Sequence, residues 1–278
     1  MDDINHLIEL AINEDIGDGD HTSLACIPSN AKGKAQLLVK QNGIIAGIEI
    51  AKQVFQQIDP NLTILQFIED GVTVKIGDVA FTIEGNSQSI LKAERLALNF
   101  MQRMSGIATK TNHYNKLLKG LNTKILDTRK TTPGLRTIEK MAVKIGGGEN
   151  HRMGLYDMIM IKDNHIDYAG GIKQAIETAN NYLQQQKKDL KIEIEARNLE
   201  ELHQILETGN VHQIMLDNFS FKDLRTAVQL IDGKYITEAS GGITEDTIRE
   251  YAECGVDYIS VGALTHQINS LDLSLKAI

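Results

Sequence analysis

Charged and polar residues follow each of six short apolar runs in the second part of the chain. The runs are residues 124–127, 158–162, 192–196, 213–217, 235–239 and 257–262. The residues at their ends are Asp127, Arg129, Lys130, Lys162, Asp163, Asn164, Glu195, Arg197, Asp217, Asn218, Glu238, Ser240 and Gly262. Cations of this kind bind carboxylates and phosphates, and a carboxylate stabilises positive charge that develops in a reaction. Six such ends in one series favour a shared binding or catalytic site over six unrelated helix caps or turns.

The spacing of the runs indicates how these residues are positioned. Glu195, Asp217, Ala239 and Val261 stand 22 residues apart each time. This period suits a strand, a helix and two short loops, and the stretch 199–209 has helical spacing and ends at Gly. Six successive strand–helix units predict a barrel, complete or incomplete, rather than a doubly wound sheet. Ligands of such barrels bind at the carboxyl ends of the strands.

The last two runs end in glycine-rich segments, residues 238–244 and 260–264. Backbone N–H groups freed by glycine, next to a helix N-terminus, bind anions, and barrels often bind phosphate after their last two strands. We therefore expect a phosphate site there.

The first part of the chain has a different pattern. Residues 34–40 predict a strand that turns at Asn42-Gly43, and the runs 72–76 and 79–83 alternate as in an antiparallel meander. Helical periodicity begins at about Ser89. Arg103 falls on the apolar stripe of that helix, so we expect it to be paired in the interior, aimed at a ligand or partner subunit, or extended at the helix rim.

Length, composition and charge limit the class of protein. The chain has 278 residues, which predicts two domains, here 1–110 and 111–278, with the extreme C-terminus able to pack back on the first. The net charge of −8 argues against a nucleic-acid binder. Residues 129–165 carry seven Lys/Arg and four acids, hence +3, and the rest carries −11. This basic segment predicts either a small anionic ligand or a solvated cationic face.

Location is also constrained by the sequence. No stretch approaches 18 uninterrupted apolar residues, so no membrane span is expected. The acidic start is unlike a secretion signal, and two cysteines are too few for a disulfide scaffold. We expect a cytoplasmic protein.

Taken together, these residues resemble the quinolinate phosphoribosyltransferase family over nearly the whole chain. The motifs that carry the resemblance are EDIGDGDHTS (14–23), LNFMQRMSGIATKT (98–111), DTRKTTPGLR (127–136), GGGENHRMGLYDMIMIKDNH (146–165), IEIEAR, IMLDNF, EASGGIT and ISVGALTH. They follow one another in family order.

The resemblance implies a mixed fold (α/β with α+β), in which a β-rich N-terminal sandwich domain stands beside an open, TIM-like α/β barrel. It implies a pentosyltransferase that moves phosphoribosyl from phosphoribosyl pyrophosphate (PRPP) to quinolinate. The products are nicotinate mononucleotide, pyrophosphate and CO2, in NAD biosynthesis, with Mg²⁺ as the metal. It also implies a homodimer, which can assemble further, with sites formed across the interface.

The resemblance also assigns residues to substrates. Quinolinate would meet Arg129, Lys130, His151, Arg152 and Lys162, with Thr131 in the same loop and Arg103 donated by the neighbouring subunit. Glu195 and Asp217 would hold the ribose hydroxyls and magnesium of PRPP, and its 5-phosphate would meet Ser240, Gly241, Gly242, Gly262, Ala263 and Leu264. Lys130, Lys162, Glu195 and Asp217 are the expected catalytic residues, the two lysines assisting proton delivery.

Three alternatives remain at this point. A phosphoribosyltransferase of the same fold could use another acceptor, such as nicotinate, although the dense set of cations favours two carboxylates. Residues 69–85 are reminiscent of biotinyl or lipoyl carrier domains, but the Met-Lys-Met or Asp-Lys-Ala sequence of a modified lysine is missing. A metabolite-binding regulator would not need Glu195 and Asp217 beside the cations.

Overall fold

The computed structural model describes residues 2–278, and contacts divide them into two units. Unit 1 comprises the chain up to Asn112 together with Thr131–Gly147 and Ala263–Ile278. Unit 2 comprises His113–Lys130 and Gly148–Gly262. This division differs from a boundary at residues 110 and 111, because two later segments make their contacts with the first part of the chain.

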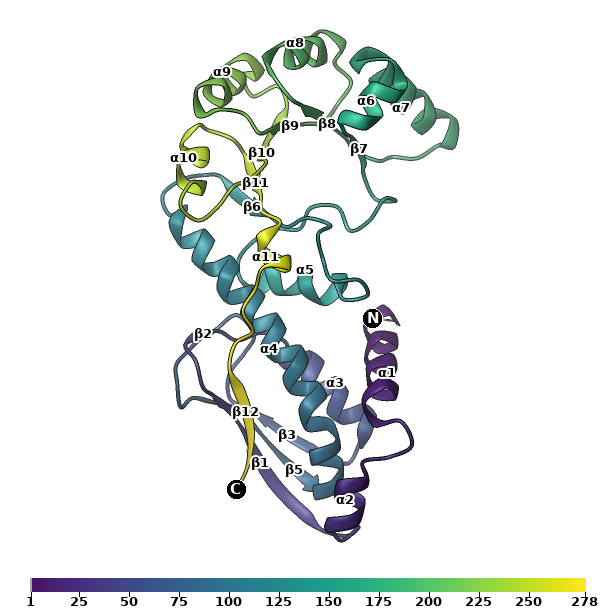
Figure 1. Ribbon diagram of the computed structural model, residues 1–278, viewed down its shortest axis with the longest axis vertical. Coiled ribbons are helices and arrows are strands. Elements are labelled where there is room, and N and C mark those ends of the chain that lie inside the picture. The colour runs from purple at the N-terminus through teal and green to yellow at the C-terminus, as the bar shows by residue number, and fades with distance from the viewer. Residues whose placement is uncertain (1) are drawn as a thin grey trace. The chain divides into compact units, whose positions relative to one another are not determined.

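Unit 1 contains a four-stranded antiparallel sheet of order β12-β1-β5-β3 (Figure 1). Its strands are β1 (Lys32–Val39), β3 (Thr63–Gln66), β5 (Val79–Asn86) and β12 (Leu273–Ala277). A second sheet pairs β2 (Gly43–Ile44) with β4 (Thr73–Val74). The hairpin expected at Asn42-Gly43 and the meander of 72–83 are therefore wrong: β1 pairs with β12 and β5, and β4 and β5 lie in different sheets.

Helices contribute more to unit 1 than its β-rich sequence pattern predicts. They are α1 (Asp2–Ile16), α2 (His21–Cys26), α3 (Ile48–Ile58), α4 (Ser87–Leu117, which continues into unit 2), α5 (Arg136–Ile145) and α11 (Ala263–His266). Phe55 of α3 meets Phe81 of β5 edge to face, with ring centroids 6.2 Å apart. The sequence predicts two apolar stripes on α4, and both are buried except at Leu91, which is exposed: Leu91, Leu98 and Met101 on one, and Leu96, Phe100, Met104 and Ile107 on the other.

Unit 2 is built on a six-stranded parallel sheet of order β6-β11-β10-β9-β8-β7. The strands are β6 (Lys124–Leu126), β7 (Ile159–Ile161), β8 (Ile192–Ala196), β9 (Gln213–Asp217), β10 (Ile236–Ser240) and β11 (Tyr258–Ser260). Each lies within a predicted run except β10, which extends one residue past the run 235–239. Because β6 and β7 are the two edge strands of this sheet and do not pair with each other, the barrel is open, as expected.

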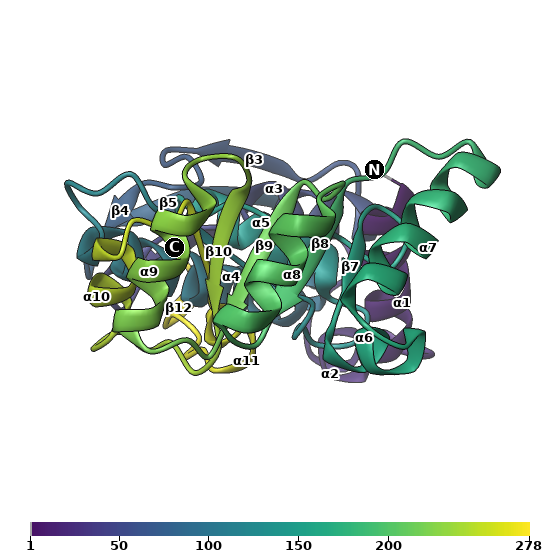
Figure 2. The same cartoon turned by 90° about the horizontal axis from the view of Figure 1, so that it is seen from above.

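Helices cover the outer side of these strands (Figures 1 and 2). They are α6 (Asp163–Ala169), α7 (Ile172–Gln186), α8 (Leu199–Thr208), α9 (Phe221–Ile231) and α10 (Ile248–Glu253). The side chain of Asn198 accepts the N–H of Glu201 at the start of α8, and that of Ser220 accepts the N–H of Asp223 at the start of α9. Because of these caps, α8 and α9 each begin only a few residues after the preceding strand.

Strands with cover on both faces should be apolar throughout. All five residues of β8 are buried, yet two of them, Glu193 and Glu195, are acids. Such acids need partners, and their partners define the site described below. Among residues 2–278, the helices include none long and apolar enough to cross a membrane.

Candidate functional site

A cavity of about 330 Å³ opens at the carboxyl ends of the unit 2 strands. It collects five predicted acceptor-binding residues and one predicted phosphate-binding residue: Arg129, Lys130, His151, Arg152, Lys162 and Ser240. It is also lined by Asp127, Thr128, Met160, Met215, Glu238 and Ser260. Residues from segments more than 100 positions apart therefore share one basic cavity.

The cations in this cavity lie close enough to affect one another. Burial and the charge of Arg129 lower the pKa of Arg152. The Nη1 group of Arg152 donates to the carbonyl of Met158 at 3.2 Å, but its buried Nε finds no hydrogen-bond partner within residues 2–278. A desolvated donor beside a second cation is favourable where an anion binds.

Lys162 and Glu195 stand at the ends of neighbouring strands. Their Nζ and Oε2 atoms are 3.6 Å apart, and the Glu195 side chain is nearly buried. Burial raises the pKa of Glu195, the charge of Lys162 opposes this, and the charge of Asp217 adds to it. Asn218 donates from Nδ2 to Oδ2 of Asp217 at 2.6 Å, which orients that carboxylate. Glu195 and Asp217 offer the oxygen ligands that magnesium prefers.

Asp127 anchors the segment that carries His151. Its carboxylate is fully buried and accepts the backbone N–H of His151 at 2.9 Å and the side-chain amide of Asn150. An isolated parallel bridge between Leu126 and Glu149 holds the same segment along β6. Asp127 thus supports the cavity in addition to lining it.

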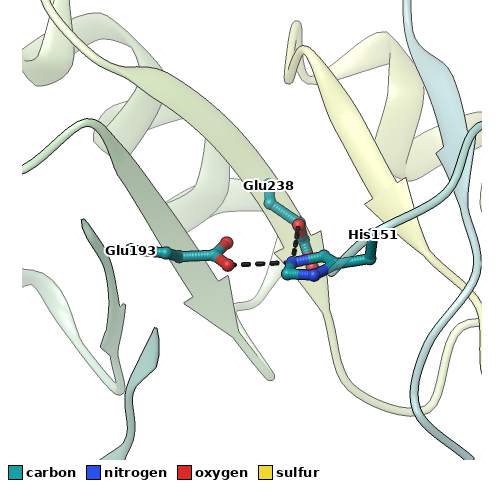
Figure 3. Close-up of side chains that lie close together, drawn as sticks. All are labelled: His151, Glu193 and Glu238. Carbon is teal, nitrogen blue, oxygen red and sulfur yellow. Dashed lines mark hydrogen bonds and ion pairs between the residues drawn. The ribbon is translucent and has the colours of Figure 1, made fainter. Parts of the chain in front are cut away.

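His151 lies between two acids that sequence reasoning gave no partner, Glu193 and Glu238 (Figure 3). Its Nε2 is 2.8 Å from Oε2 of Glu193 and 3.3 Å from Oε2 of Glu238. Burial lowers the pKa of His151, but the two acids outweigh it and raise the pKa above its usual value. Burial and the charge of Glu238 raise the pKa of Glu193. The signal in the sequence was Glu193, the second acid besides Glu195 in a five-residue buried strand.

These three residues also have the composition of a metal site. One ligand atom from each of His151, Glu193 and Glu238 lies within 4.8 Å of the others. However, Gln213 donates from Nε2 to both carboxylates, at 2.8 Å to Glu193 and 2.9 Å to Glu238. Donors therefore already occupy the acids, and the geometry fits a hydrogen-bonded network better than a metal centre.

In the glycine-rich segment after β10, the backbone has a conformation that lets a bound anion come close to its N–H groups. Gly241 and Gly242 have φ of 98° and 61°, a region that residues with a side chain rarely adopt. A Cβ on Gly241 would clash with the side chain of Asn218, whereas one on Gly242 would meet open space. Of the remaining phosphate-binding predictions, Gly262 belongs to unit 2, and Ala263 and Leu264 belong to unit 1.

Arg103 and Thr131 are in unit 1. Arg103 donates from Nε and Nη2 to Oε1 of Glu139, whose side chain is fully buried, and from Nη2 to Oγ1 of Thr132 at 2.6 Å. Of the interpretations offered by the sequence, interior pairing describes this geometry. The hydroxyl of Thr131 accepts Nε of Arg136 at 3.1 Å.

Known proteins resemble this chain along its whole length. Family models for the N-terminal and C-terminal domains of quinolinate phosphoribosyl transferase match residues 20–105 and 107–276. A mitochondrial quinolinate phosphoribosyltransferase [decarboxylating] of Nicotiana glauca is 44% identical over 289 residues, covering 99% of this chain and 82% of the relative.

Solved structures agree. NadC from Streptococcus pyogenes has a TM-score of 0.94 and 38% identity, covering 99% of this chain and 97% of that one. The nicotinate-nucleotide pyrophosphorylase of Francisella tularensis has a TM-score of 0.94 and 40% identity, covering 100% of this chain and 96% of that one. With both domain models matched in order and an open barrel that carries a basic cavity, the chain belongs to the quinolinate phosphoribosyl transferase family.

Proposed function

We propose that this protein transfers phosphoribosyl from PRPP to quinolinate with loss of CO2, giving nicotinate mononucleotide and pyrophosphate for NAD biosynthesis. The observation that carries this proposal is the convergence of five cationic or ionisable basic side chains on one cavity in a member of this family. A substrate with two carboxylates needs such a set, whereas a substrate with one does not.

The acceptor binds through its carboxylates. Arg129 and Arg152 are suited to bidentate contacts with them, and Lys130 and Lys162 add point charges. Burial and the charge of Arg129 lower the pKa of Arg152, and the repulsion between these two guanidinium groups is relieved when the anion binds. His151 lines the same cavity with its Nε2 turned to two acids.

PRPP binds at the neighbouring strand ends. Glu195 and Asp217 are proposed to hold the ribose hydroxyls, and Ser240 with Gly241 and Gly242 to hold the 5-phosphate. Gly262, Ala263 and Leu264 follow β11 and are proposed to complete the phosphate site. The positive φ of both glycines supports this assignment, because backbone N–H groups exposed in this way bind anions.

Charge stabilisation accounts for the chemistry. Cleavage of the bond from the ribose carbon to pyrophosphate leaves positive charge on that carbon, and Glu195 and Asp217 stabilise it. The pyridine nitrogen becomes cationic once it is alkylated. When the adjacent carboxylate leaves as CO2, its electron pair stays on the ring carbon, the cation stabilises it, and a proton delivered with the help of Lys130 or Lys162 quenches it.

Magnesium fits the donor set of Glu195 and Asp217. It binds proteins through one or two carboxylates together with substrate phosphates, and it would neutralise the leaving pyrophosphate.

Assembly and location complete the proposal. A homodimer in which Arg103 serves the neighbouring subunit would place a further cation at each acceptor site, and such dimers could assemble further. A cytoplasmic location is supported by the low cysteine content. The name of the Nicotiana glauca relative places that protein in mitochondria.

The decisive experiment measures release of CO2 and of nucleotide from quinolinate, PRPP and magnesium, with nicotinate as a parallel acceptor. We expect product from quinolinate alone. Product from nicotinate, or from neither acceptor, would refute the proposed acceptor and the assignment of the cations.

A further inference from the structure

Three neighbouring strands of the open barrel each contribute one polar side chain to its interior. Glu193 comes from β8, Gln213 from β9 and Glu238 from β10, and β9 lies between the other two. All three side chains are buried. Interior layers of such barrels are normally filled by branched apolar side chains, and burying two acids is costly unless their partners are fixed.

His151 supplies the fourth member of this group, which we call the His151 cluster: His151, Glu193, Gln213 and Glu238. The histidine comes from the segment before β7, and Figure 3 shows its ring between the two acids. Nε2 donates to Oε2 of Glu193, while Gln213 donates to Oε1 of Glu193 at 2.8 Å and to Oε2 of Glu238 at 2.9 Å. The amide thus holds the acids, and the acids hold the ring.

The other side of the ring leads to the cavity. Nδ1 of His151 accepts the backbone N–H of Arg152 at 2.7 Å, which ties the ring to the peptide of the next residue. The ring consequently connects the buried acids to the peptide that carries the Arg152 side chain into the cavity.

Glu238 also reaches the cavity wall itself. It is a lining residue, and its buried Oε1 finds no hydrogen-bond partner among the described residues. A buried carboxylate oxygen without a hydrogen bond costs folding free energy, so other contacts must hold the carboxylate in place. Here Gln213 and His151, acting on Oε2, are the groups that hold it.

We propose that Glu193 and Glu238, aligned by Gln213, are positioning residues that fix the ring of His151 and through it the Arg152 backbone, so that the Arg152 guanidinium is presented to a carboxylate of the acceptor. The role rests on the proposed function, because it concerns quinolinate rather than PRPP. A metal ion bound by His151, Glu193 and Glu238 is the competing explanation.

The test uses Glu238→Gln in the full-length protein, since glutamine keeps the volume and removes the charge. We expect the KM for quinolinate to rise 10- to 100-fold, as when groups that orient a functional side chain are lost. The KM for PRPP should change less than twofold. Gln213→Met removes the amide donors and leaves both acids in place. It should also raise the KM for quinolinate, and it replaces Glu238→Gln in the test if that variant does not fold.

A spectroscopic readout separates positioning from a merely structural role. In protein with ¹⁵N-labelled histidine, His151→Gln identifies the signals of this ring among the eight histidines of the chain. We expect a hydrogen-bonded Nε2–H proton in the unaltered protein and its loss or marked shift in Glu238→Gln. The matched control is Glu201→Gln, which removes a buried acid paired with Arg197 outside the cavity. It should lower stability and leave both KM values and the His151 signal unchanged.

Three outcomes would overturn the inference. They are an unchanged Nε2–H signal in Glu238→Gln, an equal change in both KM values, and a stoichiometric metal in the purified protein that His151→Gln removes. If the unaltered protein does not use quinolinate, the proposed function fails, while the histidine spectra and the metal analysis still test the cluster.

Discussion

Arg103 is held by Glu139 through two donors on a single oxygen: Nε and Nη2 both bind Oε1. The other oxygen of Glu139 accepts the backbone N–H of Thr132 at 3.2 Å, so this buried acid ties α4 to the segment that follows Lys130. The guanidinium is about one quarter exposed, at 27%, so its charge is partly screened by water.

Glu139→Gln should therefore destabilise the protein by about 1–3 kcal/mol, the usual range for a hydrogen bond to a charged group whose partner is removed. Urea unfolding measures this. The control is Glu149→Gln, because Glu149 forms an exposed pair with Lys124 and its loss should change stability little. Equal effects in the two variants would contradict a special role for Glu139.

Mixing two inactive variants tests whether Arg103 serves a neighbouring subunit. Arg103→Ala and Lys130→Ala are each expected to be inactive. If sites are shared across a two-fold interface, subunit exchange creates hybrid dimers with one intact site, and the mixture should recover about a quarter of full activity. No recovery after verified exchange would mean that Arg103 acts within its own chain.

Arg129→Ala should remove one of the proposed bidentate partners of quinolinate and abolish its binding, while PRPP binding is much less affected. Titration calorimetry with each substrate separately gives both affinities. A similar loss for both ligands would show that Arg129 does not belong to the acceptor site.

The barrel was predictable because its signals are local. Each short apolar run ends in polar residues, and the helices between them carry their own caps, as Asn198 and Ser220 do. The pairing in unit 1 was not predictable. Ala35 of β1 pairs with Ala277 at the far end of the chain, and Gly43 pairs with Val74 instead of turning back on β1. A turn signal such as Asn42-Gly43 does not specify a distant partner.

The same limit applies to the site. The strand ends indicate Arg129, Lys130, Lys162 and Asp217, because every parallel strand ends at the same edge. His151 and Arg152 were assigned only by the family resemblance. The partners of His151 lie 42 and 87 residues away, on the interior face of the barrel rather than at its rim. Which of two acids in one strand meets the histidine depends on register: Glu193 pairs with Gln213, whereas Glu195 lies beside Lys162.

Asp217→Asn should mainly lower kcat or change the dependence on magnesium, with a smaller effect on quinolinate binding. The substitution keeps an oxygen ligand and the contact with Asn218 but removes the charge that we propose to stabilise the ribose carbon. Initial rates at several magnesium concentrations measure both effects. Full activity at every concentration would remove Asp217 from the mechanism.

Asp70→Asn should stabilise the protein at neutral pH. Burial and the charges of Glu49 and Glu69 raise the pKa of Asp70, against the bonds it accepts from the backbone N–H groups at the start of α3. A folded-state pKa above the unfolded value means that the ionised carboxylate costs stability at pH 7, and that this cost disappears as the pH falls below the ordinary value of about 4. Asparagine keeps an acceptor for the N–H of Ile48 without the charge.

The control for this prediction has the opposite sign. The N–H of Asn61 lowers the pKa of Asp59, so its carboxylate stabilises the fold above the ordinary pKa and stops doing so as the pH falls through the lowered value. The measurement is the urea midpoint of each variant relative to the unaltered protein, from pH 7 to about pH 3. At pH 7 the midpoint should be higher in Asp70→Asn and lower in Asp59→Asn. Both differences should shrink as the pH falls. A gain in Asp70→Asn that persists unchanged in acid would show that burial of the charge is not its cause.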